Sequence, residues 1–353
     1  MPHREARHDS RVAIRRGMAV VTAALALAAC GGSGPEKTEF TADPLTQTVP
    51  ASTIPADTPV EPGVFQLIGR PTLTYDLVRT GAADFGAEGL SMRIADAASD
   101  AAAGGALRAG TADGAILPTD VALALAAGGQ RLRIVLLLTS LTSAEAIVAR
   151  GELAGSRIAY VPGSDGELLV QAALAAADVS AATARLVPTA DPGAAVLDGS
   201  ADAAAVDGAR AVELADADPA LQVVATAGDQ PGLLSRVLVV REDVARTKPG
   251  QLLAFVRGWQ DLYLRERDDP EVAAARIAAR TGASVERVTA GLAGLSLYDV
   301  PANAVELLPG GEFYDRTLRA IGAASTASGR LDGPVDETTL IDAAFAQSVA
   351  TAG

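Results

Sequence analysis

The 353-residue chain is poor in reactive side chains, because it contains one cysteine and two histidines. Both histidines, His3 and His8, precede the cysteine, Cys30. Histidine is the commonest general base and transition-metal ligand, and a thiolate is a common nucleophile. A chain shortened to begin at Cys30 would keep no histidine, and one cysteine cannot form an internal disulfide. We therefore expect no metal, no cofactor and no catalytic residue, and a binding protein rather than an enzyme.

Aromatic residues are also scarce, at 3%, although 49% of the residues are hydrophobic. The cores must therefore consist mainly of Ala, Val and Leu. The length allows two lobes, each with a core of its own. The net charge of −14 argues against nucleic acid as a partner and against broad docking on anionic lipid. Nothing in the composition calls for an oligomer, and we expect a monomer.

The first 30 residues have the pattern of an export signal. Arginines precede an apolar stretch, Met18 to Ala29, of about 12 residues, whereas a bilayer crossing needs roughly 20. Residues 27–30, Leu-Ala-Ala-Cys, resemble the lipobox of bacterial lipoproteins. The resemblance implies removal of residues 1–29, a lipid with palmitate on Cys30, and a place in the periplasm or on the outer face of the cell membrane. The alternative is an ordinary signal peptide with an incidental cysteine.

The remaining chain divides into a linker and an α/β body. Residues 31–62 are rich in Pro and Thr and show no sustained period, which predicts a flexible linker. From residue 64 on, short apolar runs alternate with Ala-rich stretches, which predicts mostly parallel sheets with helices on both faces. The predicted strands are 64–68, 114–117, 132–138, 146–149, 157–161, 203–206, 222–225 and 237–240. The predicted helices include 75–80, 100–108, 120–127, 166–176, 209–215, 249–267, 270–280 and 284–291.

One short pattern occurs twice. Residues 110–115, Gly-Thr-Ala-Asp-Gly-Ala, are echoed by residues 199–204, Gly-Ser-Ala-Asp-Ala-Ala. Each copy follows a leucine and leads through a short apolar strand into a loop and a helix. The echo predicts one copy in each of two lobes, and chance similarity in an Ala-rich chain is the alternative.

Ligands of open α/β sheets bind beyond the carboxyl ends of the strands, so the loops there hold the candidate ligand-binding residues. In the first lobe these are Arg70, Thr72, Thr119, Asp120, Ser140 and Thr142. In the second lobe they are Gly163, Ser164, Asp165 and Asp207.

The strongest local pattern is residues 160–167, where a strand runs through a Gly/Ser turn into a helix. Free N–H groups beside the Ser164 hydroxyl could hold an anion or a polar headgroup, or Ser164 could simply cap the helix. The same two interpretations apply to Thr119, Asp120 and Asp207. Arg70 could clamp a carboxylate or sulfonate with two hydrogen bonds, or remain solvated. Trp259, on the predicted helix 249–267, is expected in the core.

The order and spacing of several degenerate motifs resemble extracellular substrate-binding proteins of ABC importers. The most similar branch is the nitrate, sulfonate, taurine and thiamine-precursor group, and the resemblance covers about residues 64–350. The motifs lie in residues 107–120, 134–138, 146–150, 153–159, 199–207 and 238–243.

The resemblance implies a two-lobed periplasmic-binding-protein fold of type 2. Lobe I would be residues 63–150 plus 235–353, and lobe II residues 151–234, with crossings near Glu145–Gly151 and Leu234–Val240. A small-molecule solute would bind between the lobes, which would close by hinge bending and dock on the transmembrane subunits of an ABC permease.

The chain departs from this family in its first cleft loop, which lacks an aromatic residue, and at Asp207, where Trp-Glu-Pro is often found. Asp120, Asp165 and Asp207 would repel a simple oxyanion. The ligand expected is therefore a small polar organic solute, sulfonate- or taurine-like, zwitterionic or heteroaromatic. Two alternatives stay open: an enzyme on the same fold, of thiamine-pyrimidine or menaquinone-precursor type, and a ligand sensor for a membrane receptor.

Overall fold

The computed structural model describes residues 53–180 and 183–352. The chain divides into two units, Met1–Thr46 and Gln47–Gly353, and the description below concerns the second. The predicted signal peptide, Cys30 and linker residues 31–52 lie outside the described residues. Within the described ranges, no helix combines the length and hydrophobicity that a membrane crossing requires.

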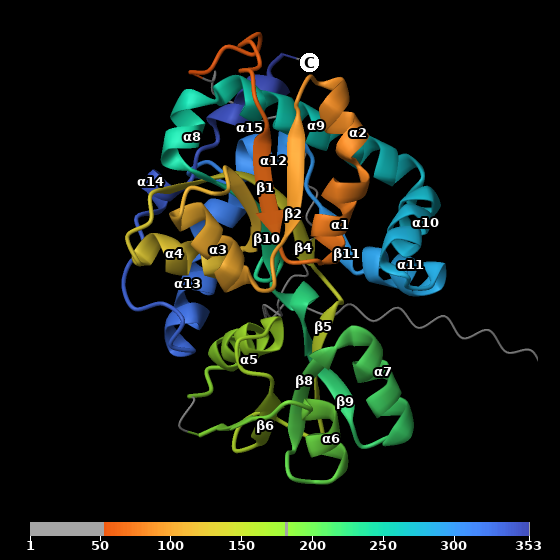
Figure 1. Ribbon diagram of the computed structural model, residues 1–353. Coiled ribbons are helices and arrows are strands. Elements are labelled where there is room, and N and C mark those ends of the chain that lie inside the picture. Colours follow the sequence, from red (N-terminus) through yellow and green to blue (C-terminus); the bar gives the residue numbers. More distant parts are fainter. Residues whose placement is uncertain (1–52, 181–182, 353) are drawn as a thin grey trace, which may run out of the picture. The chain divides into compact units, whose positions relative to one another are not determined.

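The strands of the described residues form two mixed sheets (Figure 1). The first sheet runs in the order β11 (Leu295–Leu297), β4 (Leu132–Leu141), β10 (Ser235–Arg241), β3 (Gly114–Pro118), β1 (Phe65–Gly69) and β2 (Met92–Asp96). The second runs in the order β7 (Arg185–Pro188), β6 (Arg157–Tyr160), β8 (Ala203–Asp207), β5 (Glu145–Ala149) and β9 (Gln222–Thr226).

Most strands of each sheet run in one direction, which agrees with the prediction from the sequence, but each sheet also contains an antiparallel strand between two of them. In the first, β1 pairs parallel with β2 and β3, while β10 pairs antiparallel with both β3 and β4. In the second, β6 pairs parallel with β7 and β8, while β5 pairs antiparallel with β8 and β9. The antiparallel strands β5 and β10 follow a change of sheet rather than a crossover helix, so no rule for βαβ units fixes their direction.

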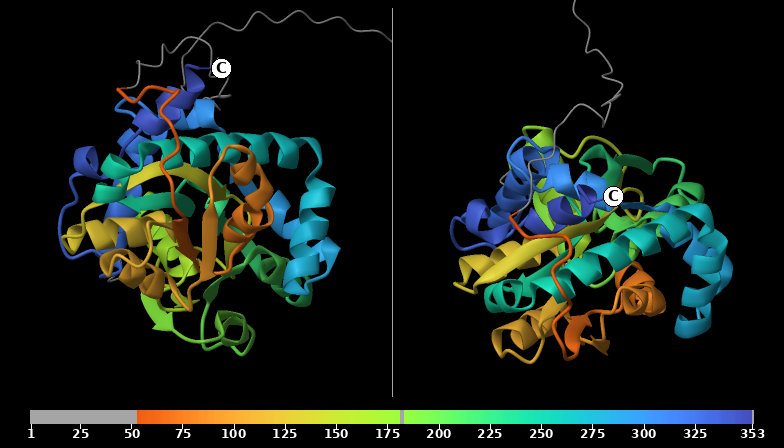
Figure 2. Two further views of the ribbon diagram at one scale, coloured as in Figure 1. Left: turned by 45° about the horizontal axis from the view of Figure 1, so that its top comes forward. Right: turned by 90° about the horizontal axis from the view of Figure 1, so that it is seen from above.

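Helices cover both faces of the first sheet. One face packs on α3 (Asp100–Arg108), α4 (Thr119–Ala127) and α13 (Leu318–Ala327), and the other on α1 (Leu73–Thr80), the 20-residue α9 (Pro249–Asp268), α12 (Val300–Glu306) and α15 (Ala344–Ala350). Figure 2 shows α9 lying along its face. The alternation of strand β10 fits this arrangement: Val237 and Val239 join one core, Leu238 and Val240 the other. Trp259 is fully buried on α9, which confirms its predicted core position.

The remaining helices complete the two layers. The second sheet has α5 (Asp165–Ala176) on one face and α6 (Pro192–Leu197) and α7 (Gly208–Ala217) on the other, followed by the 3-10 turn η1 (Ala227–Asp229). Beside the first sheet lie α2 (Ala82–Ala87), α8 (Glu242–Thr247), α10 (Pro270–Thr281), α11 (Val285–Ala293), the π-helix η2 (Phe313–Thr317) and α14 (Glu337–Leu340).

One hydrophobic cluster continues from the first sheet into the second. It joins β3 and β4 to β5 and β8 through contacts between α5 and α13. Leu168 and Leu169 of α5 and Ile321 and Ala324 of α13 are buried members of it. The two sheets therefore share a core.

The echo of residues 110–115 in 199–204 is structural. Gly110 and Gly199 both have positive φ, +71° and +78°, and each precedes a strand, β3 in the first sheet and β8 in the second. Asp113 accepts the backbone N–H of Gln66 at 2.9 Å, and Asp202 accepts that of Arg157, also at 2.9 Å. Each aspartate thus ties the start of its strand to the neighbouring parallel strand, one copy in each sheet.

All eight predicted strands form, but the crossings lie elsewhere than predicted. Glu145–Ala149 is a strand of the second sheet, so the chain changes sheet between Leu141 and Glu145 rather than after residue 150. It returns between Thr226 and Ser235, ahead of the predicted Leu234–Val240, which is largely strand β10. An apolar run between two sheets can pair in either, and here the alternation of Ile147 and Val148 fits the two faces of the second.

The last part of the predicted linker is also different from the prediction. The Glu61 carboxylate accepts the N–H groups of Gly250 and Gln251 at 3.1 and 2.9 Å, and Val60 packs on the core. These N–H groups lack partners inside α9 because they lie in its first turn, and a carboxylate there is favoured by the helix dipole. Residues 53–62 therefore belong to the body.

Candidate functional site

One predicted loop of the second sheet meets the first sheet at a buried ion pair. Arg236, at the start of β10, is only 5% exposed, and its guanidinium lies 2.5 Å from Asp165 Oδ2 at the start of α5. Burial alone would lower the pKa of Arg236, but the carboxylates of Asp165, Asp120 and Asp100 outweigh it and raise that pKa. Breaking such a pair would leave a buried charge without a partner, which is costly.

A second link starts from Arg330, which follows α13. Its guanidinium lies 2.7 Å from Asp120 Oδ2 on α4 and 2.8 Å from Glu167 Oε2 on α5, and it donates to the Ser164 carbonyl at 2.6 Å. Asp120 is buried. Two arginines thus join helix starts that follow strands of different sheets.

The Gly/Ser turn before α5 satisfies its own polar groups. Gly163 has φ +77° and donates its N–H to Glu167 Oε2 at 2.8 Å. Ser164 caps α5 by accepting the Glu167 N–H at 3.3 Å, and its hydroxyl donates to the Val161 carbonyl at 2.7 Å. Of the two interpretations from the sequence, the structure bears out the helix cap. A contact between this turn and a ligand stays a prediction.

The other predicted residues also have partners within the chain. Thr72 and Asp207 cap α1 and α7 by accepting the N–H groups of Tyr75 and Arg210 at 3.4 and 2.9 Å. Thr119 is not a cap; its hydroxyl lies 2.7 Å from that of Ser235.

Three more predicted residues complete the set. Arg70, with a half-exposed side chain, lies 3.3 Å from Asp100. Ser140 lies 3.3 Å from the Tyr298 hydroxyl, and Thr142 donates to the Gly294 carbonyl at 3.1 Å. The structure thus joins Asp120, Ser164 and Asp165 through the two arginines. The remaining predicted residues have other partners: Thr72 and Asp207 cap the helices that follow them, and Arg70, Ser140 and Thr142 contact residues far along the chain.

Sequence reasoning missed Glu145, the first residue of β5. It lies opposite Asp207 in the β5–β8 pair. Burial, together with the charges of Asp165 and Asp207, raises the pKa of its carboxyl to about 8, against the opposing effect of Arg236. Both Glu145 and Arg236 are charged residues at the start of an apolar strand. That pattern is the signal in the sequence that could have identified them as site residues.

A small cavity of about 240 Å³ lies at the carboxyl ends of β6 and β8. Among its lining residues are Glu145, Ser164, Asp191, Asp207 and Arg210. Two predicted residues therefore border a hollow of the second sheet. Among the residues that the structure describes, no three His, Cys, Asp or Glu side chains are grouped to hold a metal ion.

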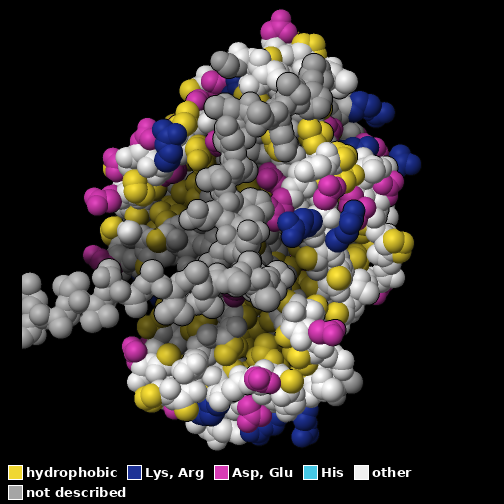
Figure 3. Space-filling view, turned by 180° about the vertical axis from the view of Figure 1, so that it is seen from behind, with side chains coloured by type: hydrophobic (Ala, Val, Ile, Leu, Met, Phe, Trp, Pro, Cys, Tyr) yellow, Lys and Arg dark blue, Asp and Glu magenta, His cyan; other side chains and the backbone are white. Residues whose placement is uncertain are grey.

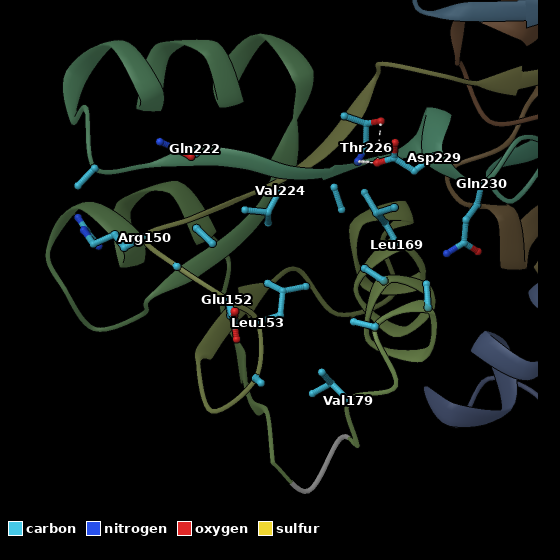
Figure 4. Close-up of a pocket in the computed structure, with 18 residues that line it drawn as sticks. Arg150, Glu152, Leu153, Leu169, Val179, Gln222, Val224, Thr226, Asp229 and Gln230 are labelled. Carbon is cyan, nitrogen blue, oxygen red and sulfur yellow. Dashed lines mark hydrogen bonds between the residues drawn. The ribbon is translucent and has the colours of Figure 1, made fainter. Parts of the chain in front are cut away.

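A larger cavity, of about 940 Å³, lies between α5 and β9 and contains no predicted site residue (Figure 4). Leu169 of α5, Val224 of β9 and Leu153 and Val179 from the loops give it an apolar lining. Polar groups stand at its ends, Arg150 and Glu152 at one and Asp229 and Gln230 at the other. From behind, hydrophobic side chains gather in the lower half of the view in Figure 3.

The model of one protein family, described as NMT1/THI5 like, matches residues 84–273, more than half of the chain. The chain belongs to the NMT1/THI5-like family. The matched region of this NMT1/THI5-like chain contains most of the first sheet and all of the second. No curated protein sequence matches the chain.

Solved structures resemble the NMT1/THI5-like chain in fold. The periplasmic aliphatic sulphonate binding protein SsuA from Escherichia coli has a TM-score of 0.63 at 15% identity, over 79% of this chain and 97% of that one. The alkanesulfonate-binding protein SsuA from Xanthomonas axonopodis pv. citri, bound to MOPS, has 0.59 at 17%, over 80% and 99%. A Candida albicans protein with the generic periplasmic binding protein fold has 0.58 at 12%, over 80% and 96%. The chain therefore has the periplasmic-binding-protein fold that the resemblance implied.

Proposed function

We propose that this protein is a solute-binding lipoprotein of an ABC importer, held outside the cytoplasm by a lipid on Cys30. It would bind a small polar organic solute between the two sheets and deliver it, as a monomer and without chemistry, to the permease. The observation that supports the proposal is the Arg236–Asp165 pair, which joins the two sheets at the ends where we expect the ligand to bind. The family match, and neighbours that are named as sulfonate-binding proteins, support it.

The charges of the site bear on the class of solute. Asp120 and Asp165, which we expected to repel an oxyanion, are paired with Arg330 and Arg236. The raised pKa of Glu145, about 8, keeps that carboxyl largely neutral at pH 7. Asp207 remains as an exposed carboxylate beside the small cavity. Sulfonates, zwitterions and heteroaromatic rings therefore all remain in the proposal.

A thermal-shift screen of sulfonates, amino acids, pyrimidines and polyamines tests solute binding. The soluble Cys30→Ser chain is the material, and a ligand at 100 times its Kd should stabilise it by about 2.7 kcal/mol. Turnover of a stabilising compound, followed by mass spectrometry, would support the enzyme alternative instead. Stabilisation by none of these classes would count against solute binding.

Asp207→Asn then separates ligand contact from capping. Asparagine caps a helix about as well as aspartate, so the unliganded melting temperature should stay the same. Loss of the charge should change the affinity for the solute if Asp207 contacts it. The matched control is Asp299→Asn, which alters the cap of α12 away from the small cavity. Equal affinity in both variants would remove Asp207 from the site.

The anchor is tested separately. The wild-type precursor should fractionate with membranes after expression with its signal, and the Cys30→Ser variant should be released. A variant that stays in the membrane fraction would refute lipidation at Cys30 while leaving solute binding untouched.

A further inference from the structure

A cavity of about 430 Å³ lies at the opposite edge of the first sheet from the candidate site. It is bordered by the start of β4, the end of β10, and α8. Four arginines line it: Arg108, Arg131, Arg241 and Arg246. This concentration is unexpected in a chain with a net charge of −14. We call this cavity the arginine pocket.

The two carboxylates in the arginine pocket are already neutralised. Asp243 accepts two hydrogen bonds from Arg241, at 2.9 and 3.1 Å. Glu242 lies 2.5 Å from Arg133, just outside the pocket, and 3.9 Å from Arg131. Neither carboxylate is therefore free to pair with Arg108 or Arg246.

Arg108 and Arg246 have no carboxylate within ion-pair distance among the described residues. In the amide orientation that satisfies both groups, the Gln130 oxygen accepts from Arg108 at 2.8 and 3.0 Å, which contributes no charge. Arg108 lies in the last turn of α3 and Arg246 in the last turn of α8, where the helix dipole stabilises a cation. The helix ends therefore place two exposed arginines at one cavity, and neither has a carboxylate partner among residues 53–180 and 183–352.

We propose that the arginine pocket binds a phosphate group, with Arg108 and Arg246 as the groups that contact it. The planar guanidinium fork matches phosphate oxygens, and the hydrogen bonds are charge-assisted. The volume lies within the roughly 300–1,000 Å³ of small-molecule sites, so a phosphate ester or a phospholipid headgroup can supply the group.

The headgroup source rests on the lipid that we propose on Cys30. Residues 59–61 lie against Gly250 at the start of α9, four residues after Arg246. Figure 1 shows α8 and the first described residues at the same end of the first sheet.

Calorimetry with inorganic pyrophosphate tests the free-phosphate source. It uses the soluble Cys30→Ser chain at constant ionic strength, since salt screens exposed charges. The double variant Arg108→Gln/Arg246→Gln should bind at least about tenfold more weakly, because loss of even one charge-assisted hydrogen bond lowers the affinity by a factor of about ten or more. Lysine at both positions keeps the charge and should restore part of the affinity. Arg287→Gln, on exposed α11, is the control and should leave binding unchanged.

Co-sedimentation with vesicles tests the headgroup source. Vesicles of phosphatidylglycerol and phosphatidylcholine are compared with phosphatidylcholine alone. Arginine-dependent binding of the anionic vesicles supports a headgroup, and arginine-dependent binding of pyrophosphate supports a free phosphate ester. If neither probe binds, or if the double variant binds both as well as the wild type does, the proposal is overturned.

Discussion

Replacing Glu145 by glutamine should make the protein more stable at alkaline pH. The pKa of the Glu145 carboxyl is raised from its ordinary 4.5 to about 8 by burial and by two neighbouring carboxylates. Between these pH values the folded chain holds a proton that the unfolded chain has released. Raising the pH through this window therefore favours unfolding, and the loss is complete above about pH 8.

The magnitude follows from the same two values. Each factor of ten in proton affinity corresponds to about 1.4 kcal/mol, so the full difference is about 5 kcal/mol. Solvent reaches part of the side chain and the salt screens it, so we expect about 2–4 kcal/mol. Glutamine resembles the protonated carboxyl and should leave stability at pH 5 nearly unchanged.

Urea unfolding of the soluble Cys30→Ser chain at pH 5, 7 and 9 measures this effect. The quantity of interest is the free energy of unfolding of Glu145→Gln minus that of the parent, which should grow with pH. Other groups titrate in both proteins and cancel in the difference. Glu152→Gln, at an exposed position of the next turn, is the control and should run parallel to the parent. Parallel curves for Glu145→Gln as well would refute the reasoning.

Three further predictions concern single side chains. A Cβ at Gly208 would lie 2.0 Å from the Ser143 carbonyl oxygen, so Gly208→Ala should lower stability by about 1–3 kcal/mol in urea unfolding. The fully buried Asn303 both accepts from and donates to the backbone of β4, at 2.6 and 2.9 Å, so Asn303→Ala should lower the free energy of unfolding by about 2–4 kcal/mol. Hydrogen bonds from Arg157 lower the pKa of Asp202 to about 2, so wild-type stability should fall from pH 4 to pH 2 by up to about 1 kcal/mol more than that of Asp202→Asn. An equal acid loss in both proteins would contradict this assignment.

The strands that the sequence predicted are those with continuous apolar runs. The three missed strands, β2, β7 and β11, lie at sheet edges and are at most half-buried. Residues such as Arg93 and Asp96 break the apolar pattern of β2. Such segments become strands because they pair with the backbone of an adjacent strand. The local composition does not show that this strand is present.

For each of the two ion pairs in the candidate site, the sequence predicted the acidic residue but not the arginine. Asp120 and Asp165 follow predicted strands, so the rule for open α/β sheets finds them. Their partners, Arg330 and Arg236, lie far along the chain, 210 residues from Asp120 and 71 from Asp165. No local spacing links residues so distant, and the match depends on how the sheets fold together.

The hydrophobic cluster that runs through α5 and α13 has a consequence for cooperativity. Because the two sheets share buried side chains, unfolding one would expose apolar surface of the other. Calorimetry should therefore show a single transition for the body, with the calorimetric and van't Hoff enthalpies equal. A fragment holding the second sheet alone would expose Leu168 and Leu169 to solvent and should associate or unfold. The two sheets are thus two halves of one folding unit.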